Sequence, residues 1–327
     1  MTYEEAKLSF ERLFSGEMAE IEARDFLTKL YLDGESCDEI RAAVEVMRDK
    51  SIKLDVSDEI RSRLIDNCGT GGDKSGSFNI STTVSVVLAS LGCVVAKHGN
   101  RSITSKSGSA DMLEALGARL EMPNEQKIKM LEDVGFAFLF AANHHPAMKH
   151  IMPIRKSLPH RSIFNILGPM TNPTTLKHHL IGVFDFSFAP KIADTLLKTG
   201  STKGFVVCSR DGLDEASVCD ITNAIFFDQN GQKEMVIDAS EYGLKRADKA
   251  ELLGGDASQN ASITFELLKR GENGAKKDIV LLNSALALMV NNLARDIQDG
   301  IAMSTEAIDS KAAFKKLTQI VEVSKKL

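Results

Sequence analysis

The first 62 residues carry apolar side chains at the three- and four-residue spacing of amphipathic helices. These positions form the groups Leu8, Leu13, Phe14; Ile21, Phe26, Leu27, Leu30; and Ile40, Ala43, Val44, Met47. Thr2 with Glu5 and Ser36 with Glu39 have the S/T-x-x-E form, in which each side chain accepts a hydrogen bond from an amide at the other end of the first helical turn. The pattern predicts three or four short helices and no strand.

After Ile60, short apolar runs typical of strands alternate with segments of helical spacing. The expected strands are Cys93–Ala96, Phe136–Phe140, His179–Val183, Phe205–Cys208 and Ala224–Phe227, and the expected helices are Thr82–Leu91, Ala110–Leu116, Glu125–Val134, Pro190–Lys198 and Ile279–Ala294. Such alternation predicts the α/β class with a mainly parallel central sheet. We expect a small helical domain at 1–62, joined by part of 153–175, and a larger α/β domain at 63–327.

Composition and charge exclude several classes of protein. The chain has 327 residues, more than the roughly 250 to 300 at which a single core stops growing. A net charge of -5 argues against nucleic acid as the main partner. The five cysteines include no C-x-x-C pair, which indicates a reducing cytoplasm. The amino terminus lacks the form of a signal peptide, and no run approaches about 18 uncharged apolar residues, so we expect neither secretion nor membrane insertion.

A glycine-rich stretch, DNCGTGGDKSGSFNIST, spans residues 66–82 between an expected short strand and an expected helix. Glycines let backbone amides approach an anion, and a helix amino terminus adds unpaired N–H groups, so phosphate is the natural occupant. The spacing matches neither the Rossmann nor the P-loop fingerprint. For an isolated glycine cluster, a tight turn or linker would be the ordinary interpretation.

A second stretch, KHGNRSITS at 97–105, follows the expected strand at Cys93–Ala96. It places two cations, an amide and three hydroxyls around one glycine, at the strand end where open α/β sheets bind ligands. This favours an anion site over a solvated turn. Ser107–Asp111 follows it as another helix start rich in small residues, and that motif would be weak alone.

Two further features are ambiguous by themselves. Asp214 and Glu215 follow the expected strand Phe205–Cys208 and could recruit magnesium to a bound diphosphate, although an isolated acidic pair is usually an exposed turn. Arg155 could hold a carboxylate through two parallel hydrogen bonds, or it could be a surface cation on a helix.

Taken together, these motifs closely resemble the motif series of the anthranilate phosphoribosyltransferases, in both order and spacing. The matching motifs are Gly69-Thr70-Gly71-Gly72-Asp73, Asn79-Ile80-Ser81-Thr82, Lys97-His98-Gly99-Asn100-Arg101-Ser102, Ser107-Gly108-Ser109-Ala110-Asp111 and Leu213-Asp214-Glu215. The resemblance spans nearly the whole chain, including the segment from His145 to Pro173. It implies the fold of the nucleoside phosphorylases and related phosphoribosyltransferases, a homodimer formed through the helical domain, and an Mg²⁺-dependent enzyme of tryptophan biosynthesis with two ions per subunit.

The resemblance also implies roles for individual residues. It places around phosphoribosyl pyrophosphate (PRPP) the residues Gly69, Gly72, Asp73, Ser77, Asn79, Ser81, Thr82, Lys97, Ser105 and Ser109. It places around anthranilate the residues Gly69, His98, Asn100, Arg155 and Pro169. Ser81, Asp214 and Glu215 would serve the magnesium ions, and no covalent nucleophile or general base is implied.

The chain departs from the family pattern at two positions near Arg155. Pro159 stands where the family usually has glycine, and Ser162 replaces the more typical threonine, so the shape of the acceptor pocket is in question. The phosphate-binding motifs show no such departure.

Two other functions fit parts of the pattern. A pyrimidine nucleoside phosphorylase would share the implied fold, but Lys97–Ser102 and Asn79–Thr82 favour the transferase. A noncatalytic nucleic-acid-binding relative is opposed by the acidic pI near 5.9. The sequence does not reveal whether a separate anthranilate synthase subunit binds this chain.

Overall fold

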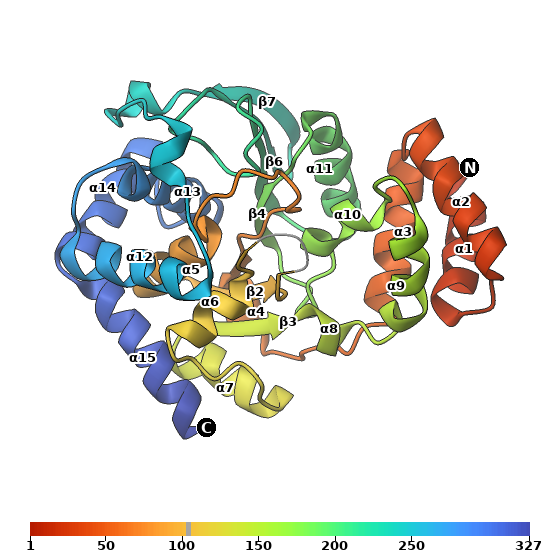
Figure 1. Cartoon of the computed structure of the whole chain (residues 1–327), viewed down its shortest axis with the longest axis horizontal. Helices are drawn as coiled ribbons and strands as arrows, with labels where there is room; N and C mark the ends of the chain where they lie inside the picture. Colours follow the sequence, from red (N-terminus) through yellow and green to blue (C-terminus); the bar gives the residue numbers. More distant parts are fainter. Residues whose placement is uncertain (103–105) are drawn as a thin grey trace.

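The helical domain occupies one end of the molecule in the computed structural model, which describes residues 1–102 and 106–327. Its helices α1 (Tyr3–Ser15), α2 (Glu20–Asp33) and α3 (Cys37–Asp49) lie at the right of Figure 1. Helix α4 (Asp58–Arg63) leads into the sheet, and its buried Ile60 packs in the core of the α/β domain. Both expected capping boxes, Thr2 with Glu5 and Ser36 with Glu39, are present. The helices predicted for the amino terminus are therefore confirmed.

The central sheet has the strand order β3-β2-β1-β4-β5-β6-β7. The strands are β1 (Leu64–Asp66), β2 (Val94–Gly99), β3 (Phe136–Phe140), β4 (His178–Gly182), β5 (Lys203–Ser209), β6 (Thr222–Asp228) and β7 (Gly231–Ile237). Strands β1 to β5 are parallel, and β6 pairs antiparallel with both β5 and β7. The mainly parallel sheet is confirmed, and β7 is a strand that the apolar pattern did not predict.

Helices cover both faces of this sheet. They are α5 (Ile80–Ser90), α6 (Ser109–Ala115), α7 (Asn124–Asp133), α8 (Ala141–His144), α9 (Met148–Ser157), α10 (Phe164–Leu167), α11 (Ala189–Lys198), α12 (Ala257–Arg270), α13 (Ala275–Val290), α14 (Ile297–Asp309) and α15 (Ala312–Lys326). Short 3₁₀ helices lie at Gly168–Met170, Phe186–Phe188, Ala239–Tyr242 and Lys249–Leu252. Within the described part of the chain, no helix has the length and apolar character needed to cross a bilayer.

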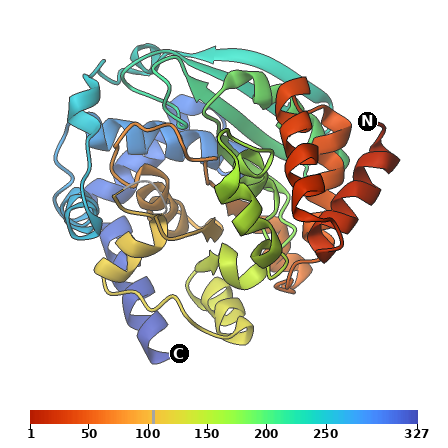
Figure 2. The same cartoon turned by 45° about the vertical axis from the view of Figure 1, so that its right-hand side comes forward.

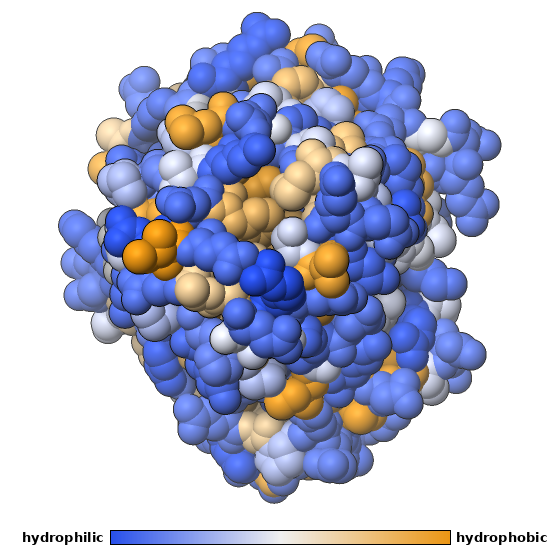
Figure 3. All heavy atoms as spheres, turned by 90° about the vertical axis from the view of Figure 1, so that its right-hand side faces the viewer, coloured by the Kyte–Doolittle hydropathy of each residue, from blue (hydrophilic) through white to orange (hydrophobic). Residues whose placement is uncertain are grey.

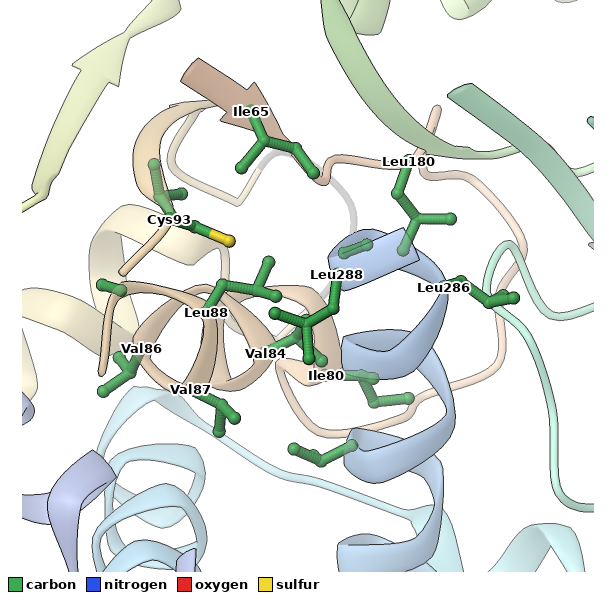
Figure 4. Close-up of a cluster of buried hydrophobic side chains, with 14 of the residues drawn as sticks. Ile65, Ile80, Val84, Val86, Val87, Leu88, Cys93, Leu180, Leu286 and Leu288 are labelled. Atoms are coloured by element: carbon green, nitrogen blue, oxygen red, sulfur yellow. The ribbon is translucent and has the colours of Figure 1, made fainter. Parts of the chain in front are cut away.

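Alternate residues of the central strands supply two hydrophobic cores, because successive side chains of a strand point to opposite faces. Phe205 and Val207 of β5 join a core with α5 and α13, in which Figure 4 shows Ile65 and Leu180 above those two helices. Val206 joins the other core, which contains α11 and the helices of the amino-terminal domain. Figure 2 shows these layers from a second direction, with the carboxyl-terminal helices and the helical domain on opposite sides of the sheet.

Helix α9 and the segment after it belong to this second core. Ile151, Ile154 and Phe164 are buried with residues of α1 and α3, and the Phe14 and Phe164 rings lie 5.8 Å apart. The chain therefore returns from the sheet to the helical domain before it enters β4. This crossing brings the residues after α9 to the carboxyl ends of β1 and β2, because Arg161 contacts Gly72 and Gly168 contacts His98.

Candidate active site

The glycine-rich loop joins β1 to α5 at the carboxyl edge of the sheet. Gly71, Gly72 and Gly76 have φ values of +69°, +77° and +67°, and the loop ends at the start of the buried helix α5. Positive φ is accessible to glycine at little steric cost, which explains why the sequence places glycines at these positions. The expected order of strand, loop and helix is confirmed.

The loop lies directly against Asp214, which comes from the loop after β5. The Gly71 N–H donates to Asp214 Oδ2 at 2.7 Å, and the Thr70 N–H donates to the Gly182 carbonyl at 2.8 Å. A Cβ atom on Gly69 would lie 2.3 Å from Asp214 Oδ2, and one on Gly182 would lie 1.5 Å from the Asp214 carbonyl oxygen. These close approaches leave room only for glycine.

Lys97 joins the second predicted loop to the first. Its side chain is 1% exposed, and its Nζ donates to the Asn67 carbonyl and to Ser81 Oγ, both at 3.2 Å. Thr82 follows in the buried part of α5, and its Oγ1 has no hydrogen-bond partner among the described residues. Lys97, Ser81 and the glycine-rich loop are thus brought together, as the sequence predicted.

Asn100 and Ser109 also meet at this edge. Ser109 Oγ donates to the Asn100 carbonyl at 3.3 Å, and a Cβ on Gly99 would lie 2.4 Å from Ser109 Oγ. Asn79 contacts the same region, because Ser107 Oγ donates to Asn79 Oδ1 at 3.2 Å. Ser105, predicted to bind PRPP, lies outside the described residues.

The acidic residues repel one another at the junction of these loops. Burial and then the Asp73 carboxylate raise the pKa of Asp214 to about 7, while the Gly71 amide opposes the shift. Burial and then Asp214 raise the pKa of Glu215, and the Lys97 ammonium opposes that rise. A site that crowds carboxylates in this way is suited to a divalent cation, which would favour their charged forms.

Protein side chains alone do not complete a metal site here. Within residues 1–102 and 106–327, no three His, Cys, Asp or Glu side chains are grouped to hold a metal ion. Mg²⁺ commonly keeps several waters and takes one or two carboxylates together with substrate phosphates. The pair Asp214 and Glu215 fits that form of binding.

His98 borders a second, less polar part of the site. Its Nδ1 lies 3.1 Å from the Gly168 carbonyl, next to buried Pro169, and its ring meets His145 edge to face at 5.3 Å. Burial lowers the pKa of His98 to about 3 and that of His145 to about 4. Both imidazoles are therefore neutral near pH 7, which suits a pocket for an aromatic ring.

Arg155 lies on α9, with its guanidinium 5.5 Å from the centre of the Phe164 ring. Burial lowers the pKa of this guanidinium, and no carboxylate of the described residues pairs with it. Among the described residues, no hydrogen bond or ion pair joins Arg155 to His98 or Pro169, whose region is marked by the contact of His98 with Gly168. Pro159 and Ser162 lie in the loop from α9 to α10, where the Ser162 N–H donates to Asn165 Oδ1 at 3.0 Å.

The sequence did not predict a group of buried polar residues that joins the strand ends to the loops of the site. Asp66 Oδ2 accepts from Asn172 Nδ2 at 3.0 Å, and Asn172 Nδ2 also donates to the Ala96 carbonyl at 2.8 Å, which joins the ends of β1 and β2. Asn67 Nδ2 donates to the Ser81 carbonyl at 2.8 Å. Asp66 and Asn67 open the glycine-rich stretch, so their position beside the motif was the available signal.

Comparisons with known proteins identify the family. Residues 61–314 match the model of the glycosyl transferase family a/b domain, and residues 1–51 match the helical bundle domain of the same family. The chain is 42% identical over 301 residues to an anthranilate phosphoribosyltransferase of Thermoanaerobacter sp. (strain X514), covering 92% of this chain and 88% of that relative.

Solved structures agree. The crystal structure of anthranilate phosphoribosyltransferase from Thermus thermophilus has a TM-score of 0.93 and 36% identity, covering 99% of this chain and 96% of that one. The Saccharomyces cerevisiae enzyme in complex with PRPP and Mg has a TM-score of 0.89 and 24% identity, covering 100% and 94%, and shows the shared fold. With its motifs, its fold and its relatives in agreement, this chain belongs to the anthranilate phosphoribosyltransferase family.

Proposed function

We propose that this chain transfers the phosphoribosyl group of PRPP to the amine of anthranilate, at the edge of the sheet where three loops meet. The observation that carries the proposal is the direct contact between those loops. Gly71 is bonded to Asp214, and Lys97 is bonded to Ser81, so residues from the ends of β1, β2 and β5 share one polar surface. The PRPP residues are Gly69, Gly72, Asp73, Ser77, Asn79, Ser81, Thr82, Lys97, Ser105 and Ser109.

In this proposal, Ser81, Asp214 and Glu215 hold two Mg²⁺ ions per subunit. Support comes from the repulsion that raises the pKa values of both carboxyl groups, and from the yeast family member solved with PRPP and Mg. When bound, the cations neutralise charge on the diphosphate of PRPP.

Anthranilate would bind beside His98, Asn100 and Pro169, with its carboxylate on Arg155 and with Gly69 between the two substrates. The guanidinium of Arg155, which pairs with no carboxylate of residues 1–102 and 106–327, suits a carboxylate, and the neutral ring of His98 suits an aromatic face; both support this assignment.

The reaction forms a bond from the amine nitrogen to C1 of the ribose, breaks the bond from C1 to the diphosphate oxygen, and releases a proton and pyrophosphate. Negative charge grows on the leaving diphosphate, where the Lys97 ammonium and the loop amides can stabilise it. The arylamine is neutral near pH 7, so correct placement of the two substrates provides acceleration without a strong general base.

The direct test mixes purified protein with Mg²⁺, PRPP and anthranilate and follows the loss of anthranilate fluorescence. We expect the loss to require all three additions and to release one pyrophosphate for each anthranilate consumed. Phosphate-dependent release of a free base from a pyrimidine nucleoside, without anthranilate consumption, would instead establish a phosphorylase.

The domain division at 1–62 and 63–327, with part of 153–175 joining the helical domain, is also part of the proposal. It is supported by the burial of Ile154 and Phe164 with α1 and α3. We further place the enzyme in the cytoplasm and propose that it is a homodimer formed through the helical domain.

Exposed apolar side chains on α1 and α2 support the dimer. Leu8 is 61% exposed, Ile21 76% and Leu32 74%. Ile21 and Leu32 are eleven positions apart, close to three turns, so they share a face of α2. Figure 3 views this end of the molecule and shows apolar residues among the polar ones.

Leu8→Glu combined with Ile21→Glu should convert the dimer to a monomer, because two charges would be buried on each side of the interface. Light scattering should then give a mass near 35.7 kDa instead of twice that value. The matched control is Val236→Glu, which changes an apolar residue of β7 that is 52% exposed. A wild-type mass of 35.7 kDa at micromolar concentration would contradict the dimer.

A further inference from the structure

Arg161, in the loop from α9 to α10, contacts the glycine-rich loop from outside. Its Nη2 donates to the Gly72 carbonyl at 2.6 Å, and its guanidinium lies 3.7 Å from the centre of the Phe184 ring. Phe184 follows β4 by two residues, and the β4 residue Gly182 accepts the hydrogen bond from Thr70. The ring and the carbonyl together fix the guanidinium in one plane.

The tip of the glycine-rich loop has few other attachments. Gly71 is held by Asp214, and the Gly76 carbonyl accepts from the Gly254 N–H at 3.0 Å. Between them, the hydrogen bonds of Ser75 to described residues stay within the loop, to Asp73 and Ser77, and Lys74 has a φ of +58°. The Asp73 side chain lies beside Asp214, whose carboxylate it repels. Ordering such a tip costs conformational entropy, which an external bond at Gly72 would reduce.

The bond to Gly72 also fixes the direction of the next amide. In a trans peptide the C=O of one residue and the N–H of the next point to opposite sides. Because the Gly72 carbonyl faces Arg161, the Asp73 N–H faces away from it. Among the described residues, this N–H has no acceptor, so it is available to an anion.

Arg161 is itself held from the helical domain. The neighbouring His160 ring stacks on Tyr31 of α2 at 4.3 Å with an interplanar angle of 8°, and its Nε2 lies 3.2 Å from Thr28 Oγ1. His160 Nδ1 lies 2.6 Å from the Arg161 carbonyl. The contacts therefore run without a break from α2 through His160 and Arg161 to Gly72.

We propose that Arg161 is a positioning residue for the reaction: it holds the Gly72 carbonyl so that the Asp73 N–H is directed at the diphosphate of PRPP. This inference rests on the proposed assignment of the glycine-rich loop to PRPP. It gives the segment between the domains a role in donor binding, through a residue that need not touch the substrate.

The test measures kcat and the KM values of both substrates, together with Tm, for Arg161→Gln, Arg161→Lys and Phe184→Leu. Arg161→Gln should raise the KM for PRPP about 10-fold and leave the KM for anthranilate unchanged. Arg161→Lys should recover only part of that loss, because an ammonium has no flat face to stack on the Phe184 ring. Phe184→Leu removes that ring and should raise the KM for PRPP about 3-fold. The matched control is Arg63→Gln, since exposed Arg63 also donates to a glycine carbonyl, that of Gly92, at 2.9 Å.

The other outcomes overturn the inference. A role through charge alone would leave Arg161→Lys and Phe184→Leu like the wild type, and a role in stability alone would lower Tm without changing the KM for PRPP. Gly72→Val separates this inference from the loop assignment, because a β-branched residue at a φ of +77° should disrupt the loop itself. Wild-type PRPP affinity in Gly72→Val would refute the assignment, whereas lost affinity there with a wild-type KM in Arg161→Gln would refute only the role of Arg161.

Discussion

Replacing Asp214 by Asn together with Glu215 by Gln is expected to lower kcat/KM for PRPP about 10³-fold, the scale found when fixed electrostatic stabilisation of a transition state is removed. The Mg²⁺ concentration for half-maximal rate should rise in the same variant. The pKa of each carboxyl is raised by burial and by a neighbouring carboxylate, and a bound cation would counter that repulsion. Neutral amides would remove both the repulsion and the attraction for the metal.

The double variant should keep its fold, since Asn can still accept the hydrogen bond that Gly71 donates to Asp214. Removing the crowded charges should even raise Tm slightly. The measurement is a magnesium titration of the rate at saturating anthranilate. The control is Asp220→Asn with Asp228→Asn, which removes the same number of negative charges away from the proposed metal site. Asp220 lies in the loop between β5 and β6, and Asp228 is the last residue of β6. Wild-type magnesium dependence in the Asp214 and Glu215 variant would refute the metal assignment.

Short sequence patterns were sufficient to predict many of the helices and strands. The capping boxes at Thr2 and Ser36 and the short apolar runs of the buried strands depend on neighbouring residues, so one sequence contains them. Strand β7 was missed because its first half, with Gln232, Lys233 and Glu234, is polar and exposed at the edge of the sheet, and its apolar residues are confined to its carboxyl end. The turn Asn230-Gly231 before it was the available hairpin signal.

The candidate site likewise contains residues that the sequence predicted and residues that only the structure revealed. The glycine-rich loop and Lys97 could be predicted because their residue types are those of an anion site and they stand at the ends of strands. Arg161 and Asn172 could not, since their partners Gly72 and Asp66 are distant in sequence and only the folded chain brings them together. Motifs therefore marked the surface that we assign to PRPP, while the contacts that hold this surface in place required the structure.

The acceptor side provides the second large effect. Arg155→Ala should raise the KM for anthranilate about 100-fold, since hydrogen bonds to a charged group contribute about 1.5 to 3 kcal/mol. The KM for PRPP should change little, because no hydrogen bond or ion pair of the described residues joins Arg155 to the glycine-rich loop. Arg155→Lys should recover part of the affinity, as an ammonium keeps the charge but loses the two parallel bonds.

A substrate without the carboxylate makes this test specific. With aniline as acceptor, the wild type and Arg155→Ala should have similar kcat/KM, because the group that Arg155 would bind is missing. Lys156→Ala is the matched control, as it removes an exposed cation from the next position of the same helix. Since burial already disfavours the charged guanidinium, Arg155→Ala should lose little stability, and a fall in affinity can be separated from unfolding by its Tm. An unchanged KM for anthranilate, or an equal loss with aniline, would show that Arg155 does not bind the acceptor carboxylate.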